Sequence, residues 1–221
     1  MILKNMLIFA IFAIVGWLLE VTYRSIINKK FINPGFLTGC VVPLYGVGTI
    51  IINSICSIFN KIESDYKLLL IVAISIIILT LLELFTGIIM LKLFNVKLWD
   101  YSSEKLNYKG LICLKFSLAW GVLVILFYIG IYPWLNNFIE ELLTNNITLF
   151  FLGIFYGIFL VDFCVSIDFF SKVLEYSKKM QKIVNLEKLK VESLKLPSKK
   201  FWSRLYPYNS MRRFIKEILK K

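Results

Sequence analysis

Three carboxylates stand inside long apolar stretches of the sequence, namely Glu20, Glu83 and Asp162. An ionised side chain at the centre of a lipid-embedded helix costs roughly 2.5 to 3.5 kcal/mol on insertion scales, so its presence calls for a partner or a function. Each acid lies about 15 residues from the start of its stretch, or roughly 22 Å at 1.5 Å per residue. We therefore predict that the three acids reach one depth and line a polar cavity.

Polar and small residues recur three or four positions from these acids, and such neighbours share one helix face. Arg24 follows Glu20 by four positions, and Ser166 follows Asp162 by four. Ser117 lies in a stripe of small residues in another apolar stretch and would face the same cavity. The alternative is structural: Glu20 and Arg24 form an ion pair near the membrane interface, and the other acids hydrogen-bond to Ser and Thr between helices.

The stretch NPGFLTGCVVPLYGVG, residues 33–48, interrupts the apolar pattern with four of the 11 glycines and two of the 5 prolines. Non-helical backbone at membrane depth is tolerated where it is buried in protein or lines a watery cavity. We therefore predict that this stretch bends or re-enters, and that its freed backbone groups contact a polar ligand. The alternative is a tight loop followed by a proline-kinked helix. The predicted hinge or cavity-lining residues are Gly39, Pro43, Tyr45, Gly46 and Gly48.

A third polar element is LWDYSSEKLNYKG, residues 98–110. Its Trp99 suits the aromatic belt that forms at membrane interfaces. The belt does not explain the neighbouring carboxylate, so Asp100 is a further candidate for a polar contact. The alternative for Asp100 is an ordinary helix N-cap or turn residue.

The composition defines the class of protein. Of the 221 residues, 58% are hydrophobic, and the mean hydropathy is +0.75. These values are not typical of a soluble domain, so the sequence predicts an all-α integral membrane protein. Apolar stretches near the ~20 residues that cross a bilayer predict five transmembrane helices. They lie at about residues 4–23, 41–60, 68–91, 111–133 and 147–170. The polar segment 136–146 is too short to cross and predicts a surface turn or an interfacial helix.

Cationic residues predict the orientation, because Lys and Arg beside a span tend to stay in the cytoplasm. Residues 172–221 carry 15 of the 26 Lys and Arg but only 4 of the 14 Asp and Glu. The C-terminus is therefore predicted inside, and five spans place the N-terminus outside, with the polar cavity open to the cytoplasm. The chain then divides into a transmembrane domain, residues 1–171, and a basic helical cytoplasmic tail, residues 172–221. The sequence thus predicts a multi-pass protein of the cell membrane.

A cleaved signal peptide is the alternative for residues 4–23. It would remove Glu20 from the mature chain. The apolar run continues into GWLLEVTYRS without an obvious small-residue cleavage site, which favours a retained first span.

Residue types exclude several chemistries. The chain contains no His, which excludes imidazole metal sites and His-based acid–base catalysis. Its four cysteines form no CxxC pair and suit helix packing. The phosphate-binding P-loop motif is absent from the sequence, so the chain cannot bind a nucleotide in that way. We therefore assign no catalytic residue, no metal and no cofactor, and the sequence favours a protein that is not an enzyme.

The basic tail predicts a partner of its own. Residues 174–196 contain good helix formers with a loose apolar face, and Pro197 would end that helix. Beyond it, KKFWSRLYPY and MRRFIKEILKK interleave cations with aromatic and apolar residues. Each cation near an anionic inner leaflet contributes about 1 kcal/mol, so we predict contact with anionic lipids. A protein partner is an alternative, and nucleic acid is not expected because no nucleic-acid-binding signature is present.

The candidate residues also carry a family resemblance. The positions are Gly16-Trp17 with Glu20, Gly39 to Gly48 with Pro43-Leu44-Tyr45-Gly46, Glu83, Trp99-Asp100-Tyr101-Ser102, Asn107, Gly110, Cys113, Ser117 and Trp120-Gly121. Together they resemble one bacterial family, the CmpB-like group of proposed type IV ABC-transporter permeases, once a domain of unknown function. The resemblance covers about residues 5–171 and leaves the basic tail outside. It implies a membrane transport component, with energy supplied by a separate ATPase subunit.

Three function hypotheses follow. The first is a transport component whose cavity binds a small polar or cationic solute, with the three intramembrane acids as solute or proton contacts. The second is a membrane-embedded enzyme that acts on a lipid or lipid-linked substrate, with Asp100 or Glu20 as acid–base groups. Arg24 or Lys115 would hold a phosphate in that enzyme. The third is a regulatory or scaffold subunit that works through its tail. The resemblance favours the first hypothesis.

Overall fold

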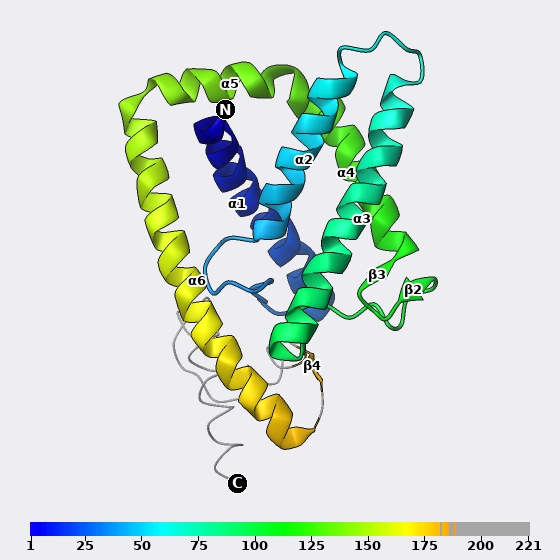
Figure 1. Cartoon of the computed structure of the whole chain (residues 1–221), viewed down its shortest axis with the longest axis vertical. Coiled ribbons are helices and arrows are strands. Elements are labelled where there is room, and N and C mark those ends of the chain that lie inside the picture. The colour runs from blue at the N-terminus through cyan, green and yellow to red at the C-terminus, as the bar shows by residue number, and fades with distance from the viewer. Residues whose placement is uncertain (182, 186–187, 189–221) are drawn as a thin grey trace. The chain divides into compact units, whose positions relative to one another are not determined.

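The structure is a computed structural model that describes residues 1–181, 183–185 and 188 of the chain (Figure 1). This part is mostly helical, as predicted. Its helices are α1 (Ile2–Asn28), α2 (Pro43–Phe59), α3 (Lys67–Phe94), α4 (Leu114–Leu126), α5 (Tyr132–Thr144) and α6 (Asn146–Met180), with a π-helical turn, η1 (Phe127–Ile131), between α4 and α5. The strands have two residues each and are β1 (Val96–Lys97), β2 (Asn107–Tyr108), β3 (Ile112–Cys113) and β4 (Val184–Asn185).

Length and hydropathy identify the helices that suit a bilayer. In the described residues, four helical stretches are long and apolar enough to cross a membrane, namely Ile2–Asn28, Lys67–Phe94, Leu114–Thr144 and Asn146–Lys179. The shorter α2 is apolar but has 17 residues, or about 26 Å at 1.5 Å per residue, just under the ~30 Å of a hydrocarbon core. A fifth span formed by α2 stays a prediction, and so does the orientation of the chain in the membrane.

The predicted tail is only partly described. α6 continues to Met180, past residue 171, where the sequence predicts the end of the transmembrane domain. That domain boundary stays a prediction. After α6, β4 pairs in parallel with β1, in the register Val96 to Val184. Most of the helix predicted over residues 174–196, together with KKFWSRLYPY and MRRFIKEILKK, lies outside the described residues.

The chain forms two compact units. Unit 1 contains Met1–Ala13, Pro43–Thr86 and Tyr101–Phe155, and unit 2 contains Ile14–Val42, Gly87–Asp100 and Tyr156–Lys221. The helices α1, α3 and α6 each contribute residues to both units. Each candidate site below is built from residues of one unit.

Glycines allow the helices of unit 1 to approach closely. A Cβ added to Gly46 in α2 would lie 2.8 Å from the backbone oxygen of Phe9 in α1. A Cβ added to Gly121 in α4 would lie 2.7 Å from Cδ1 of Ile76 in α3. Close backbone contact of this kind is a main source of helix association in lipid, where apolar burial from water no longer drives packing.

A change of direction divides the long helical stretch Leu114–Thr144 of unit 1. Figure 1 shows α5 running crosswise to α4 after the π-helical turn η1. π-Bulges are a common cause of sharp helix bends. The segment predicted as a surface turn or an interfacial helix belongs to α5 as far as Thr144.

Aromatic rings pack the loop between α1 and α2 into unit 2. Phe36 of this loop stacks on Phe170 of α6, with 4.7 Å between ring centroids. It also lies 6.2 Å from Phe94 of α3 and 5.9 Å from Phe163 of α6. Leu37 beside it is buried as well. The middle of the loop is therefore packed against α3 and α6, as expected for non-helical backbone of a membrane protein.

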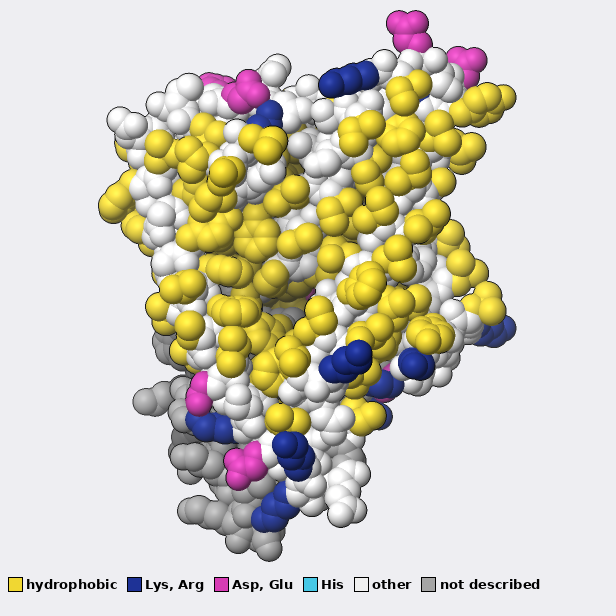
Figure 2. Space-filling view, in the orientation of Figure 1, with side chains coloured by type: hydrophobic (Ala, Val, Ile, Leu, Met, Phe, Trp, Pro, Cys, Tyr) yellow, Lys and Arg dark blue, Asp and Glu magenta, His cyan; other side chains and the backbone are white. Residues whose placement is uncertain are grey.

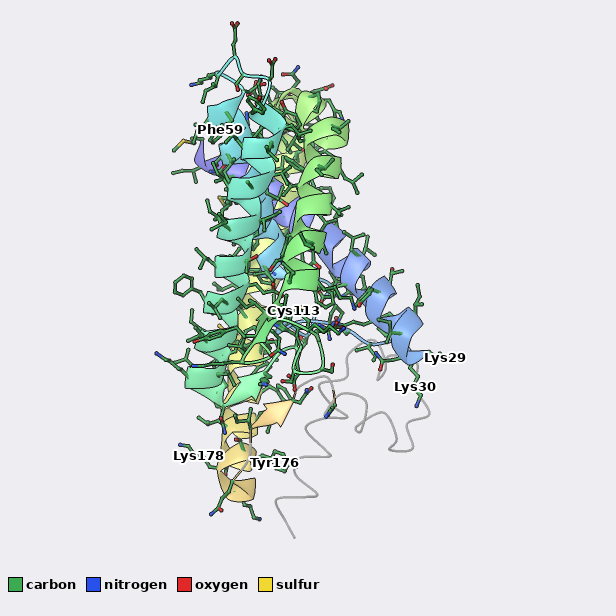
Figure 3. The ribbon with its side chains drawn as sticks, turned by 90° about the vertical axis from the view of Figure 1, so that its right-hand side faces the viewer. Lys29, Lys30, Phe59, Cys113, Tyr176 and Lys178 are labelled. Atoms are coloured by element: carbon green, nitrogen blue, oxygen red, sulfur yellow. The ribbon has the colours of Figure 1, made fainter. Side chains whose placement is uncertain are left out.

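The exposed faces of the spanning helices are apolar, and cations lie at helix ends. Figure 2 shows hydrophobic side chains over much of α3, where Ile77 and Phe85 are among the exposed residues. In unit 2, Lys29 and Lys30 follow α1, and Lys178 lies near the end of α6 (Figure 3). An apolar exterior with charges at helix ends fits a protein embedded in a bilayer.

Candidate functional site

Glu83 holds the most buried carboxylate among the predicted site residues. It lies on the apolar helix α3, and 4% of the residue is exposed. The hydroxyl of Tyr101 donates to Oε1 over 2.9 Å, and Nε1 of Trp120 donates to Oε2 over 3.3 Å. Both carboxylate oxygens are thus held by donors from other parts of unit 1, which offsets part of the cost of burial.

Aromatic rings surround these donors. Trp120 lies against Tyr45 of α2, with 5.3 Å between ring centroids and an interplanar angle of 48°. Tyr101 stacks on Phe116 of α4 at 4.4 Å. We call Glu83 with these four aromatic residues the Glu83 cluster. It joins α2, α3, α4 and the segment before α4 within unit 1.

A tight hairpin brings Tyr101 back toward α3. Strands β2 and β3 pair antiparallel around a turn in which Lys109 and Gly110 have φ angles of 54° and 71°. Consecutive positive φ angles are typical of a type I′ turn, which favours Gly because it has no Cβ. Asn107 supports the turn by accepting from the Gly110 N–H over 3.1 Å. The Tyr101 N–H donates to the Gly110 carbonyl over 2.9 Å, so the hairpin fixes the tyrosine that reaches Glu83.

The α3–α4 contact carries one more polar pair beside the Glu83 cluster. The hydroxyl of Thr80 donates to the hydroxyl of Ser117 over 3.0 Å. Thr80 precedes Glu83 by three positions, and Ser117 precedes Trp120 by three, so both pairs lie along one contact between the helices. Ser117, a predicted site residue, therefore lies next to the cluster.

Asp162 on α6 binds the loop between α1 and α2 in unit 2. Its Oδ1 accepts from the backbone N–H of Thr38 over 3.0 Å, and its Oδ2 accepts from the backbone N–H of Gly39 over 2.9 Å. The Thr38 hydroxyl also donates to Oδ1. The hydroxyl of Ser166, the predicted neighbour, lies at 3.5 Å from Oδ1. We call this arrangement the Asp162 clamp. It connects a predicted site acid with the predicted hinge residue Gly39.

Asn33 completes the clamp from inside the loop. Nε1 of Trp17 donates to Asn33 Oδ1 over 2.6 Å, and Asn33 Nδ2 donates to the Thr38 carbonyl over 2.7 Å. Asn33 is buried. The sequence interpretation missed Asn33 and Thr38 as site residues. The available signal was a polar residue at the start of a Gly- and Pro-rich stretch, 16 positions after a tryptophan of the family pattern.

Glu20 and Arg24 form the predicted ion pair in unit 2. Nε and Nη2 of Arg24 donate to Oε1 of Glu20 over 2.9 and 2.7 Å. Both side chains are largely shielded, and Asn28 donates to the Arg24 carbonyl over 2.9 Å. This geometry matches the structural alternative for Glu20, and a solute contact by Glu20 stays a prediction.

Lys115 and Asp100, two candidate residues of the enzyme hypothesis, each contact an oppositely charged side chain. Lys115 pairs with Glu104 over 2.9 Å in unit 1. Asp100 accepts from Lys97 over 3.1 Å and from Asn185 of β4 over 3.4 Å in unit 2. Asp100 therefore connects the segment after α6 to the segment after α3.

The remaining predicted hinge residues lie inside or at the start of α2. Pro43 is its first residue, where proline is favoured because the missing N–H would have no intrahelical acceptor. Gly46 packs on Phe9, and a Cβ added to Gly48 would lie 3.2 Å from Leu79. The non-helical part of the stretch therefore ends before Pro43. A hinge at these positions stays a prediction.

The three intramembrane acids belong to different sites. Glu83 lies in unit 1, whereas Glu20 and Asp162 lie in unit 2, and each has its own hydrogen-bond donors. A single cavity that contains all three stays a prediction. In the described residues, no group of three or more Cys, Asp or Glu side chains is placed to hold a metal ion.

Four helical stretches of the described residues are long and apolar enough to cross a membrane, so the class of this chain is a multi-pass helical membrane protein. A family model described as "Putative ABC-transporter type IV" matches residues 7–167, and the chain belongs to this family. The predicted resemblance to the CmpB-like group is thereby confirmed. The match includes the Glu83 cluster and the Asp162 clamp. No curated protein matches the chain. No solved structure matches it either.

Proposed function

We propose that this chain is the membrane-embedded component of a transport system, in which the Glu83 cluster contacts a small polar or cationic solute. A separate ATPase subunit supplies the energy. Membership in a family described as ABC transporters supports the general class. The observation that carries the site is the buried Glu83 carboxylate, which accepts from Tyr101 and Trp120.

The cluster favours a solute contact because its acceptor is preorganised. A carboxylate that only stabilised α3 could bond within its own helix, but the donors to Glu83 come from α4 and from the hairpin segment. Two fixed donors orient the carboxylate and leave it an anionic acceptor inside an apolar helix. In this proposal a polar cavity beside the cluster opens to the cytoplasm and admits the solute.

The Asp162 clamp supplies the proposed moving part. In the clamp, backbone N–H groups of a non-helical segment donate to the Asp162 carboxylate, and these hydrogen bonds can break without unfolding a helix. Release of Gly39 from Asp162 would free the loop that joins α1 to α2. We propose this release as the hinge step of the transport cycle, as in transporters with discontinuous helices.

Charge distribution supports the proposed orientation and the proposed lipid contact. Lys29, Lys30 and Lys178 lie at helix ends of unit 2 (Figure 3), and the predicted tail is strongly basic. We place these ends in the cytoplasm of a multi-pass protein of the cell membrane. The tail then lies near anionic inner-leaflet lipids, to which its cations are attracted.

The test measures solute flux in cells that lack the native chain and carry it on a plasmid. The probes are a labelled amino acid, a sugar, an organic ammonium ion and an inorganic cation. Wild type should accelerate at least one of them over empty vector. Glu83→Gln should lower the flux above empty vector by about tenfold or more, because one charged contact contributes about 1.5 to 3 kcal/mol.

The matched control is Glu63→Gln, which neutralises an exposed acid between α2 and α3. It should leave flux unchanged at equal membrane abundance. The proposal is refuted if no probe depends on the wild-type chain, or if Glu83→Gln carries the same flux as Glu63→Gln.

A further inference from the structure

The helix α5 presents three faces to three environments. At about 100° per residue, its apolar side chains other than Pro133 occupy one half of the helix and its polar side chains the other. Leu135 and Ile139 are 2% and 0% exposed, so one part of the apolar half packs on the protein. Trp134 and Phe138, in the other part, are 49% and 42% exposed.

The polar half of α5 points elsewhere. Asn137, Glu140 and Glu141 are exposed, and Lys4 of α1 pairs with Glu140 over 2.8 Å. The sequence of α5 contains no Lys or Arg. Attraction to anionic headgroups therefore cannot hold this helix on a membrane, whereas insertion of its exposed aromatic side chains can.

The lengths of the neighbouring elements place α5 at the end of a span. α4 has 13 residues and η1 has 5, which together rise about 27 Å, close to the ~30 Å of a hydrocarbon core. The bend at η1 then starts α5 at the membrane surface. Asn145 ends α5 in an extended conformation, with φ −93° and ψ 117°, before α6 begins.

We propose that α5 is an in-plane amphipathic helix whose Trp134 and Phe138 insert into the headgroup–acyl boundary of a zwitterionic bilayer. The two rings contact each other edge to face at 5.5 Å and form one wedge. Trp134 Nε1 donates to the Gly130 carbonyl over 2.6 Å, so its polar group is satisfied while the ring stays exposed. Such a side chain suits this boundary. The proposal does not depend on the transport proposal.

The test compares two adjacent residues that face opposite environments in the proposal. Asn137→Cys and Phe138→Cys are made in a Cys40→Ser, Cys164→Ser background, which removes the exposed native thiols. The full chain is placed in phosphatidylcholine nanodiscs and treated with a charged, water-soluble maleimide. The cysteine at 137 should react at least about tenfold faster than the one at 138, because an apolar environment suppresses the thiolate.

Each other outcome overturns the proposal. Equally fast labelling would place both positions in water, and equally slow labelling would place α5 in the hydrocarbon core. Both cysteines should react equally after unfolding in detergent, which controls for intrinsic reactivity. A second measurement uses brominated lipids: Trp134→Phe should reduce the fluorescence quenching by bromines near the headgroup, whereas Trp120→Phe, which removes a buried indole, should not reduce it. Quenching that is greatest at the chain centre would contradict an in-plane helix.

Discussion

Replacing Gly39 by alanine should open the Asp162 clamp. A Cβ at this position would lie 2.9 Å from Oδ2 and 3.6 Å from Cγ of Asp162, closer than a Cβ normally approaches an oxygen. The carboxylate cannot simply turn away, because Thr38 holds it through its backbone N–H and its hydroxyl. The backbone at Gly39 has no positive φ, so the effect comes from lost space.

The expected magnitude follows from the bond that must lengthen. The Gly39 N–H donates to the charged Oδ2 over 2.9 Å, and a hydrogen bond to a charged group contributes about 1.5 to 3 kcal/mol. Loss of that bond should lower the free energy of local opening of the loop by the same amount. Amide exchange through this opening should then accelerate by about 10- to 150-fold.

Hydrogen exchange followed by mass spectrometry measures this opening on peptides that cover residues 31–42. The matched control is Gly157→Ala on α6, also in unit 2, where an added Cβ meets no atom within 4 Å. Alanine is favoured over glycine within a helix by about 1 kcal/mol, so the control should leave the loop unchanged or slow its exchange.

Equal exchange of the loop in Gly39→Ala and wild type would refute the clamp. Asp162→Asn provides the second arm, because its amide turns one acceptor into a donor that faces a backbone N–H. If the clamp exists, Gly39→Ala should add little in the Asp162→Asn background, since both substitutions remove one interaction. Full additivity of the two effects would show that they act on separate features.

Two further predictions concern unit 1. Tyr101→Phe keeps the ring but removes the donor to Glu83 Oε1, so the free energy of unfolding should fall by about 1.5 to 3 kcal/mol. Thermal melting in detergent measures this loss, and an unchanged melting temperature would contradict it. Gly121→Ala should lower stability, whereas Gly153→Ala should not, since the latter Cβ meets nothing within 4 Å. Ile76→Val deletes the clashing Cδ1 and should restore part of the stability lost in Gly121→Ala, and no rescue would contradict the contact.

The class of protein and most helices could be predicted from local sequence alone. Apolar stretches near the length of a bilayer span identified the regions of α1, α3, α4 and α6, because hydropathy depends only on composition within a window. The sequence predicted a surface turn or an interfacial helix over residues 136–146, but it did not predict the bend that turns α5 crosswise. It follows from η1, and a π-helical turn in FYIGI has no marker in residue type.

The candidate residues could be named from the sequence, but their partners could not. Asp162 and Gly39 were singled out as an acid in a span and a glycine in a loop, yet 123 positions separate them. Spacing predicted Ser166 as a neighbour of Asp162, whereas backbone N–H groups approach more closely. A backbone donor is present at nearly every residue and leaves no signature. Likewise, Thr80 lies three positions before Glu83 on α3, but its hydroxyl donates to Ser117 of α4.

The Glu83 cluster and the Asp162 clamp have one feature in common: a carboxylate on a helix binds a non-helical segment of the same unit. Asp162 holds the loop at Gly39, and Glu83 holds the hairpin segment through Tyr101. This design sharpens the choice between a structural and a transport role. If Glu83 only anchors the hairpin, Tyr101→Phe and Glu83→Gln should reduce stability and solute flux in proportion. If Glu83 also contacts solute, Glu83→Gln should lose far more flux than Tyr101→Phe, even if the two variants have the same melting temperature. Proportional losses in the two variants would remove the case for a solute contact and leave Glu83 a structural anchor.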